Sequence, residues 1–259
     1  MKNRKKNIKL SALIIAHNEE KNLHFCLDKL RSVDEIVVVL DKTNDKSKSI
    51  SKKFTKKIYE GSWKLEGERR NFGLKKCTGD WILEVDADER VTSELLIEIK
   101  NKIVLADPGY FLIPFDNFVG KKKIRYGWGA SWGVSAAPRL SYKGYKKWND
   151  KQSIHPSLTL KGKKGRLINR INHYVDEDIK DMLIRLNTYS DKKAYDIIAN
   201  KEKIPPLFII IRKAITRFLK CYFSRKGYKE GRWGFLIALM AALFIIFSYL
   251  KASLENKNT

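Results

Sequence analysis

Strand-like and helix-like segments alternate through the first hundred residues, and this alternation limits the possible folds more than any other feature of the chain. Four short strand-like segments recur there, at residues 10–16, 35–40, 57–60 and 81–85. Such alternation is typical of βαβ units, whose buried strands run parallel in one sheet. A chain of 259 residues can form one large α/β domain or two small ones. We therefore predict an α/β fold with a mostly parallel central sheet.

Helical periodicity fills the segments between these strands. Leu23, Leu27 and Leu30 share one face of a helix that we expect to begin with Asn18 as its N-cap. Residues 93–104 show a similar spacing of apolar residues. Helices are therefore expected to connect the strands.

The C-terminal part of the chain is helical in pattern and strongly apolar near its end. Helical periodicity returns after Asp176, and residues 234–250 form an apolar run of 17 residues. A bilayer-spanning helix takes about 17–25 residues, so this run is at the short limit. Residues 201–232 carry ten basic and two acidic residues among many apolar ones, which favours attraction to anionic lipids. We predict a membrane-inserted or membrane-lying helix, with a buried helix of a soluble core as the alternative.

Basic residues outnumber acidic ones by 53 to 29, which gives a formal net charge of +24. Between Lys121 and Arg170, fourteen basic residues accompany one acid, Asp150, so this stretch carries +13. Such a concentration favours an anionic partner. Nucleic acid is a remote alternative only, because the acidic residues expected at the sheet edge would repel its phosphates. We therefore predict no nucleic-acid partner.

Two carboxylates follow the fourth predicted strand. Asp86 and Asp88 stand two residues apart, so on an extended chain both side chains project to the same face. Together they can share one divalent cation, which in turn can bridge two phosphate oxygens. A solvated acidic turn that caps the next helix is the alternative interpretation.

Polar residues also follow the first two strands, and parallel strands end at one edge of a sheet. Carboxylates at that edge can accept hydrogen bonds from a nucleobase and a ribose, and nearby basic side chains can contact phosphates. The sequence thus predicts a nucleotide site. Its candidate residues are Ala16, Asn18, Glu19, Asp41, Asp86 and, before the fourth strand, Arg69 and Asn71.

Three motifs occur in order with plausible spacing: IIAHNEEKNL, EIVVVLDKTNDKS and GERRNFGLKKCTGDWILEVDADERV. Together they resemble the nucleotide-binding half of family-2 glycosyltransferases with the GT-A fold, a Rossmann-like arrangement. The likeness is greatest to the branch that builds lipopolysaccharide core, and the segment KCYFSRKGYKEGRWGF resembles the membrane-proximal end of that branch. The resemblance implies a glycosyltransferase domain over residues 8–175 and a helical, membrane-associated region over 176–259. Within the domain, it implies a nucleotide-sugar-binding half at 8–107 and an acceptor half at 108–175.

The resemblance also assigns roles by position. Asn18 and Glu19 match the motif around the nucleobase, and Asp41 matches the carboxylate that reads uracil-type bases. Asp86 matches the residue near the ribose, and Asp88 matches the metal ligand of the D-x-D motif. The resemblance implies a metal-dependent enzyme of the hexosyltransferase type that uses a UDP-linked sugar with Mg²⁺ or Mn²⁺. Its acceptor would be an anionic glycolipid.

The same resemblance places the protein at the cytoplasmic face of the inner membrane, bound peripherally or through one C-terminal helix, next to anionic lipids. Transfer to polyprenyl phosphate or to a capsule or protein-linked glycan is the alternative. An inverting transfer needs a base that removes the proton of the acceptor hydroxyl. Many relatives carry a Glu after the histidine that corresponds to His155, where this chain has Pro156. The candidate bases are therefore Asp150 and His155.

Overall fold

The structure is a computed structural model that describes residues 8–129, 135–150 and 157–255. The chain divides into two compact units. The first contains residues 1–115 and 135–173, and the second contains residues 116–134 and 174–259. This division differs from the expected domain ranges, 8–175 and 176–259, because residues 116–134 group with the C-terminal helices.

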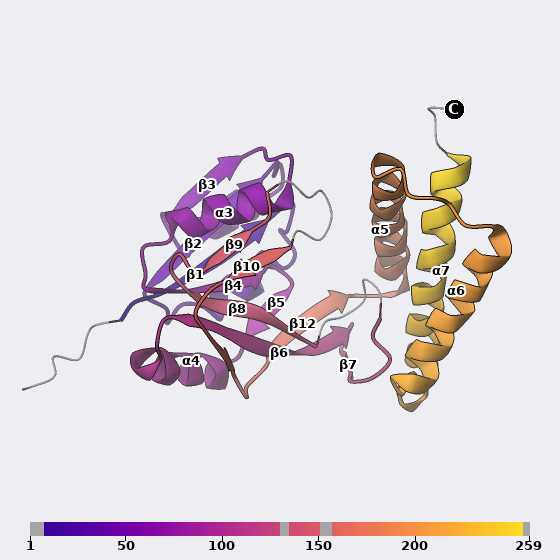
Figure 1. Ribbon diagram of the computed structural model, residues 1–259. Coiled ribbons are helices and arrows are strands. Elements are labelled where there is room, and N and C mark those ends of the chain that lie inside the picture. Colours follow the sequence, from indigo (N-terminus) through magenta and orange to yellow (C-terminus); the bar gives the residue numbers. More distant parts are fainter. Residues whose placement is uncertain (1–7, 130–134, 151–156, 256–259) are drawn as a thin grey trace, which may run out of the picture. The chain divides into compact units, whose positions relative to one another are not determined.

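The first unit contains a mixed α/β fold (Figure 1). Its helices are α1 (Leu23–Asp28), α2 (Ser47–Ser51), α3 (Glu66–Lys76) and α4 (Ser93–Leu105). Its strands are β1 (Leu10–Ala16), β2 (Glu35–Asp41), β3 (Ile58–Gly61), β4 (Trp81–Asp86), β5 (Glu89–Val91), β8 (Ala136–Tyr142), β9 (Lys146–Trp148), β10 (Leu158–Leu160) and β11 (Lys163–Arg166). Two further strands, β6 (Gly109–Val119) and β12 (Ile171–Asp176), begin in this unit and end in the second.

The order of the main sheet is β3-β2-β1-β4-β8-β6-β12-β5. The first four strands are parallel, which confirms the predicted parallel half. Strand β8 pairs antiparallel with both β4 and β6, and β12 pairs antiparallel with β5. Strands β9 and β10 form a separate antiparallel pair. The antiparallel half places residues from late in the chain beside the end of β4.

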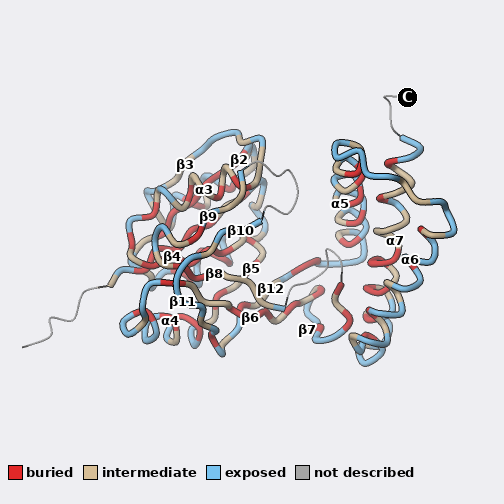
Figure 2. Tube along the Cα trace, viewed as in Figure 1, coloured by how far each residue is buried: buried red, intermediate tan, exposed pale blue. Residues whose placement is uncertain are grey.

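Strands β1, β2 and β4 are buried on both faces, which explains their largely apolar sequences, whereas β3 at the edge is partly exposed. Leu13, Val37, Val39 and Ile82 form one core cluster, on which the partly buried Phe72 of α3 packs. Gly73 allows this close approach, because a Cβ there would lie 2.6 Å from Leu13 Cδ1. Figure 2 shows buried positions along these strands and exposed positions in the loops that join them.

Asn18 is not the N-cap of the first helix, so that expectation is wrong. Helix α1 begins at Leu23, after Asn22, and Asn18 has a left-handed backbone with φ of 54°. Asparagine tolerates this conformation better than most residues. The Asn18 Oδ1 atom accepts a hydrogen bond of 2.9 Å from the backbone N–H of Asn44. Asn18 therefore joins the loop after β1 to the loop after β2.

The second unit contains a short strand and a group of helices. Strand β7 (Lys122–Ile124) pairs with the end of β6, and helix α5 (Ile179–Ala199) follows β12. Helix α6 (Leu207–Leu219) continues through the π-helical turn η1 (Lys220–Ser224) and the 3-10 turn η2 (Gly227–Glu230) to α7 (Arg232–Leu254). Helix α7 packs against both α5 and α6, and Figure 2 shows buried positions on the facing sides of α5 and α7. By length and composition alone, α7 is a candidate membrane span.

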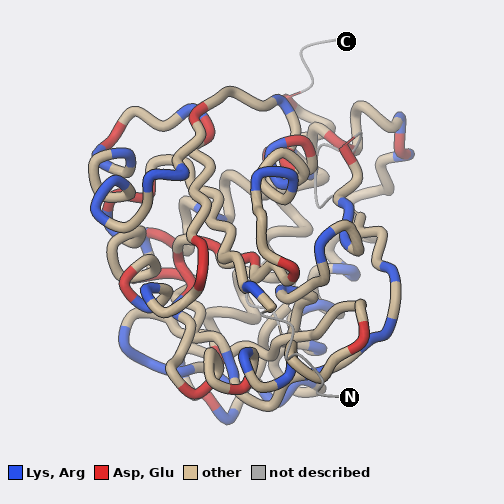
Figure 3. The backbone as a smooth tube through the Cα atoms, turned by 90° about the vertical axis from the view of Figure 1, so that its left-hand side faces the viewer, with Lys and Arg blue, Asp and Glu red and all other residues tan. Residues whose placement is uncertain are grey.

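Basic side chains are spread over both units. Figure 3 shows Lys and Arg at many separate positions, with Asp and Glu between them. Lys163 pairs with Asp107 at 3.2 Å on the surface, whereas Arg139 and Lys146 are buried. Part of the charge between residues 121 and 170 therefore acts inside the protein.

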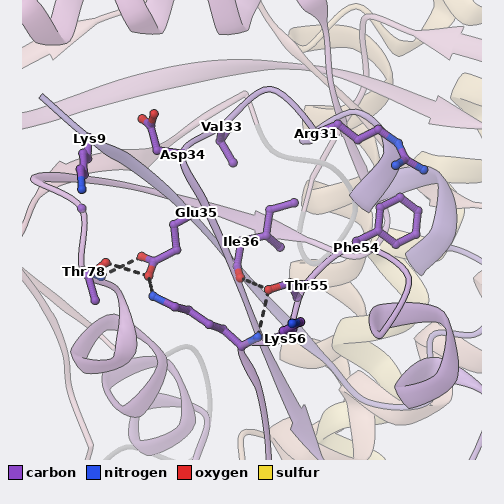
Figure 4. A pocket seen from close by; sticks show the side chains of 12 residues that line it. Lys9, Arg31, Val33, Asp34, Glu35, Ile36, Phe54, Thr55, Lys56 and Thr78 are labelled. Carbon is purple, nitrogen blue, oxygen red and sulfur yellow. Dashed lines mark hydrogen bonds and ion pairs between the residues drawn. The ribbon is translucent and has the colours of Figure 1, made fainter. Parts of the chain in front are cut away.

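A pocket of about 680 Å³ lies at the amino ends of the parallel strands (Figure 4). Glu35, at the start of β2, binds Lys57 and Ser11 and accepts hydrogen bonds of 2.7 and 2.8 Å from the backbone and hydroxyl of Thr78. Burial alone would raise the pKa of Glu35, but these hydrogen bonds outweigh it and lower the pKa to about 2. The ionised carboxylate thus links the starts of β1, β2 and β4.

Replacing Glu35 with glutamine (Glu35→Gln) is expected to lower the free energy of unfolding at pH 7 by about 1–3 kcal/mol. Because the pKa is depressed in the folded state, this contribution is present above the unfolded pKa of about 4.3 and is lost as the pH falls towards 2. Urea unfolding of both proteins across this range measures the difference. Glu60→Gln is the control, because its pair with Lys48 is half exposed. A difference that stays constant on acidification contradicts the expectation.

Candidate active site

The carboxyl ends of three parallel strands meet at one edge of the sheet. Ala16 of β1 pairs with Leu40 of β2, and Ile15 pairs with Asp86 of β4. This register places Ala16, Asp41 and Asp86 close together. The loops that follow β1 and β4 carry Asn18, Glu19 and Asp88. This edge is opposite the pocket of Figure 4, which lies at the amino ends of the same strands.

Asp41 is nearly buried, and both of its oxygens accept hydrogen bonds. The Oδ1 atom accepts from the backbone N–H of Trp63 at 3.0 Å, and Oδ2 accepts from Arg69 Nη1 at 2.8 Å. The structure thus places Asp41 and Arg69 in direct contact. A ligand that uses Asp41 as an acceptor has to share it with Arg69 or displace it.

Glu19 lies close to the carboxylates that follow β4. Burial raises the pKa of Glu19, and the negative charges of Asp88 and Asp86 raise it further, while a hydrogen bond from Asn22 opposes the change. This mutual repulsion means that the edge would gain from a bound cation or from hydrogen-bond donors.

Asp86 is held by two arginines that reach it from different elements. Arg70 of α3 lies 3.1 Å from Oδ1, and Arg139 of β8 binds Oδ2. Burial disfavours the ionised form of Asp86, but the charges of Arg139 and Arg70 outweigh it and hold its pKa well below the usual range. Asp86 is therefore an ionised carboxylate that is already paired.

Arg139 also binds Glu89, the first residue of β5. Burial raises the pKa of Glu89 to about 7, and the charge of Arg139 offsets only part of this effect. Glu84 belongs to the same network, because it pairs with the buried Lys146 and accepts a hydrogen bond of 3.0 Å from Trp148 Nε1. Arg70 also pairs with Glu66 at 2.7 Å and lies 3.8 Å from Glu84, so four acids share three basic residues near the end of β4.

Asp88 is not part of these ion pairs. Its Oδ1 atom is buried and has no hydrogen-bond partner in the part of the chain that the structure describes. Its Oδ2 atom lies 3.4 Å from His173 Nε2 on β12. Burial lowers the pKa of His173, but the contact with Asp88 outweighs burial and raises it. Asp88 thus has a free oxygen next to a histidine.

Asp88, Glu89 and His173 form a cluster suited to a divalent cation. Their candidate ligand atoms all lie within 4.8 Å of one another, so a small adjustment would let one cation contact all three. Carboxylate oxygens suit Mg²⁺ or Mn²⁺, whereas an imidazole nitrogen is a poor ligand for Mg²⁺. Asp88 Oδ1, which has no hydrogen-bond partner among the described residues, needs a positive partner. Asp86, which was predicted to share the cation, is not part of this cluster.

His173 and Arg139 were not predicted as site residues. Both lie far from the D-x-D motif along the chain, and only the antiparallel pairing brings them near it. Strand β12 pairs His173 with Glu89, and β8 lies beside β4. Local periodicity does not show which distant strands pair, so neither residue could be placed near the D-x-D motif from the sequence.

Asn71 tethers the β9 segment instead of facing the edge. It donates to Trp148 O at 2.8 Å and accepts from Trp148 N at 2.9 Å. Two residues after Trp148, Asp150 is exposed and lies against Gly67 of α3, where an added Cβ would be 3.1 Å from the Asp150 Cα. The other candidate base, His155, lies outside the described residues.

Comparisons with a family model and with curated proteins both find glycosyltransferases. Residues 11–155, more than half of the chain, match the family model described as Glycosyl transferase family 2. An uncharacterized glycosyltransferase of Rickettsia felis is 25% identical over 269 residues, covering 96% of this chain and 92% of that protein. The lipopolysaccharide core biosynthesis glycosyltransferase LpsC of Rhizobium meliloti is 25% identical over 256 residues, covering 93% and 91% of the two chains.

A solved structure shares the fold. The crystal structure of S. aureus TarS 1–349 in complex with UDP matches with a TM-score of 0.51 and 14% identity. The match covers 97% of this chain and 92% of that one. At this identity the likeness concerns the arrangement of helices and strands.

Replacing Arg139 with methionine (Arg139→Met) is expected to lower the free energy of unfolding by about 3–5 kcal/mol, because it leaves Asp86 and Glu89 short of a buried positive charge. Urea unfolding at pH 7 measures the loss. If Arg139→Met fails to fold, Arg139→Lys is measured in its place. It keeps a positive charge and should therefore lose less stability. The control Arg31→Met removes an exposed pair with Asp28 and should cost less than about 1 kcal/mol. An Arg139→Met loss as small as this would show that Arg139 does not support the network.

Proposed function

This chain belongs to glycosyl transferase family 2, and on that premise we propose that it is an inverting, metal-dependent enzyme that uses a UDP-linked sugar. The expected α/β fold of the GT-A type, with its mostly parallel sheet, is confirmed. The observation that carries the proposal is the buried Oδ1 of Asp88 at the carboxyl edge of the parallel strands, which has no hydrogen-bond partner among the residues that the structure describes. A carboxylate oxygen in that position is suited to a cation that accompanies a diphosphate.

Asp88 and His173 are proposed to hold a Mg²⁺ or Mn²⁺ ion, with Glu89 beside them. The ion would neutralise the diphosphate and act as a Lewis acid towards the leaving group. Arg139 forms ion pairs with Glu89 and Asp86, so these two acids mainly determine the shape and charge of the site. Metal binding requires the neutral form of His173, which the raised pKa opposes until the ion displaces the proton.

Asn18, Glu19 and Asp41 are proposed to line the part of the site that takes the nucleoside. Asp41 offers an acceptor for the single N3–H group of a uracil base once Arg69 moves from Oδ2. Arg69 would then be free to contact a phosphate through charge-assisted hydrogen bonds. The UDP named with the TarS structure belongs to that protein and is consistent with this assignment.

The acceptor is proposed to be a lipopolysaccharide core or a similar anionic glycolipid at the cytoplasmic face of the inner membrane. Two observations support this: the relative named for lipopolysaccharide core biosynthesis and the basic character of residues 121–170. Asp150, exposed beside Gly67, is the proposed base within the described residues. Transfer to polyprenyl phosphate, or to a capsule or protein-linked glycan, is the alternative, since these acceptors would use the same donor site.

Replacing Asp88 with asparagine (Asp88→Asn) is expected to lower turnover of the preferred donor by at least about a hundredfold, because the amide holds a divalent cation poorly. The assay measures Mn²⁺-dependent hydrolysis or transfer with UDP-, GDP- and dTDP-sugars. Calorimetry of UDP with Mn²⁺ gives a second readout that does not depend on the acceptor. Asp107→Asn is the matched control, because Asp107 pairs with Lys163 on the surface.

Full turnover by Asp88→Asn would contradict the metal assignment. Binding of GDP or dTDP in preference to UDP would contradict the donor assignment. Phosphorylated core oligosaccharide and polyprenyl phosphate, offered separately to the active protein, distinguish the two acceptor classes. Retention on DNA without any nucleotide-sugar binding would instead favour a nucleic-acid partner.

A further inference from the structure

Helix α6 has two apolar sides, and only one of them is covered by the protein. Ile210 and Ala214 are buried within the second unit. Phe208, Ile211, Ile215 and Leu219 lie within one narrow arc on a different side of the helix, where they are 43–67% exposed. Phe223 in η1 extends this row and is 58% exposed. We call these five residues the α6 stripe.

Basic residues lie on one side of the α6 stripe. At about 100° per residue, Arg212 lies about 20° beyond Leu219, and Lys220 and Lys213 lie about 100° and about 120° beyond it. Helix α6 contains no acidic residue. An apolar row beside basic side chains is typical of a helix that lies in the surface of a membrane, with its axis in the plane of the bilayer. Long basic side chains can reach the phosphates of anionic lipids from that position.

Helix α7 is the less suitable membrane element, although it is longer and more apolar. From Leu236 to Ala252, every residue of α7 except Phe247 is buried or partly buried. Ile237 and Met240 pack on Met182 and Leu186 of α5. The side of α7 that faces α5 is thus used inside the second unit, although Phe235, Phe247 and Leu254 are exposed and only 39% of the apolar window of α7 is buried.

The partner of α7 is a charged helix. Lys251 of α7 binds Asp191 of α5 at 2.6 Å and Asn187 Oδ1 at 2.8 Å. Lys192 and Lys193 of α5 carry further charge. Lys251 directly follows the apolar run at 234–250, so its pair with Asp191 would lie near the interface of a crossed bilayer. The same packing would bring Arg185 of α5, which adjoins the Leu186 that clusters with Met240, into the hydrocarbon, which is unfavourable. The packing therefore places α7 outside the bilayer core.

We infer that the α6 stripe docks the protein on a bilayer surface that contains anionic lipid, while α7 supports α6 from within and does not cross the membrane. This inference rests on the membrane-surface part of the proposed function and makes it specific. A second copy of the chain fits the stripe less well, because a symmetric contact between two α6 helices would bring their basic borders together.

The test is co-sedimentation of the full chain with vesicles of phosphatidylcholine, with and without phosphatidylglycerol. The wild type should bind the anionic vesicles. The double variant Ile211→Ser/Ile215→Ser should bind them at least about tenfold more weakly, because two apolar side chains no longer enter the interface. The matched control is Leu105→Ser/Ile168→Ser, which removes two apolar residues that are 88% and 84% exposed in the first unit and should bind like the wild type. Circular dichroism confirms that each variant is folded.

Equal binding by the α6 variant and the wild type would overturn the inference. If the wild type is a dimer in solution and the α6 variant a monomer, a second copy covers the stripe and the inference is wrong. Failure of the wild type to bind any vesicle would overturn the membrane location as well. The donor assay on a soluble acceptor is separate, so transfer activity can stand while this inference falls.

The position of α7 has its own test. Arg232→Cys and Ser253→Cys place single thiols at the two ends of α7, and the three native cysteines are buried. With inverted membrane vesicles and a membrane-impermeant maleimide, both ends should react from the same side. Reaction from opposite sides would show that α7 spans the bilayer and would overturn the inference.

Discussion

The pairing of Arg139 with both Asp86 and Glu89 is the interaction on which the candidate site depends. Buried carboxylates this close together repel one another and resist ionisation, so an unpaired group would distort the end of β4. Arg139 reaches them from β8, and Arg70 reaches Asp86 from α3. Beside these ion pairs, Asp88 has an oxygen without a hydrogen-bond partner in the described part of the chain. The arginines thus separate the structural acids from the one proposed to bind the ion.

The parallel half of the sheet could be predicted because its information is local. Residues 10–16, 35–40 and 81–85 are mostly apolar, as expected for strands covered on both faces. Parallel strands with short connections end at the same edge, so the meeting of Ala16, Asp41 and Asp86 follows once the strands are known. The family resemblance rested on the same segments and was confirmed for that reason.

The antiparallel half could not be predicted because its strands owe their form to distant partners. Strand β11 has the sequence KKGR and contains no apolar residue, yet it pairs with β6. His173 reaches Asp88 only because β12 pairs with β5. Asn18 failed as an N-cap for a similar reason, since its side chain bonds to Asn44 in another loop. In each case a contact far along the chain decides what local preference leaves open.

Net charge counted from the sequence also does not show which basic residues are buried. The +13 of residues 121–170 suggested an anionic partner, but Arg139 and Lys146 from that stretch neutralise buried acids. The charge available to an acceptor is therefore smaller than the sequence count. The argument for a membrane surface is stronger where basic residues are exposed beside apolar ones, as on α6. Composition marks α7 as the more apolar helix, whereas packing decides which helix has apolar surface left to bury.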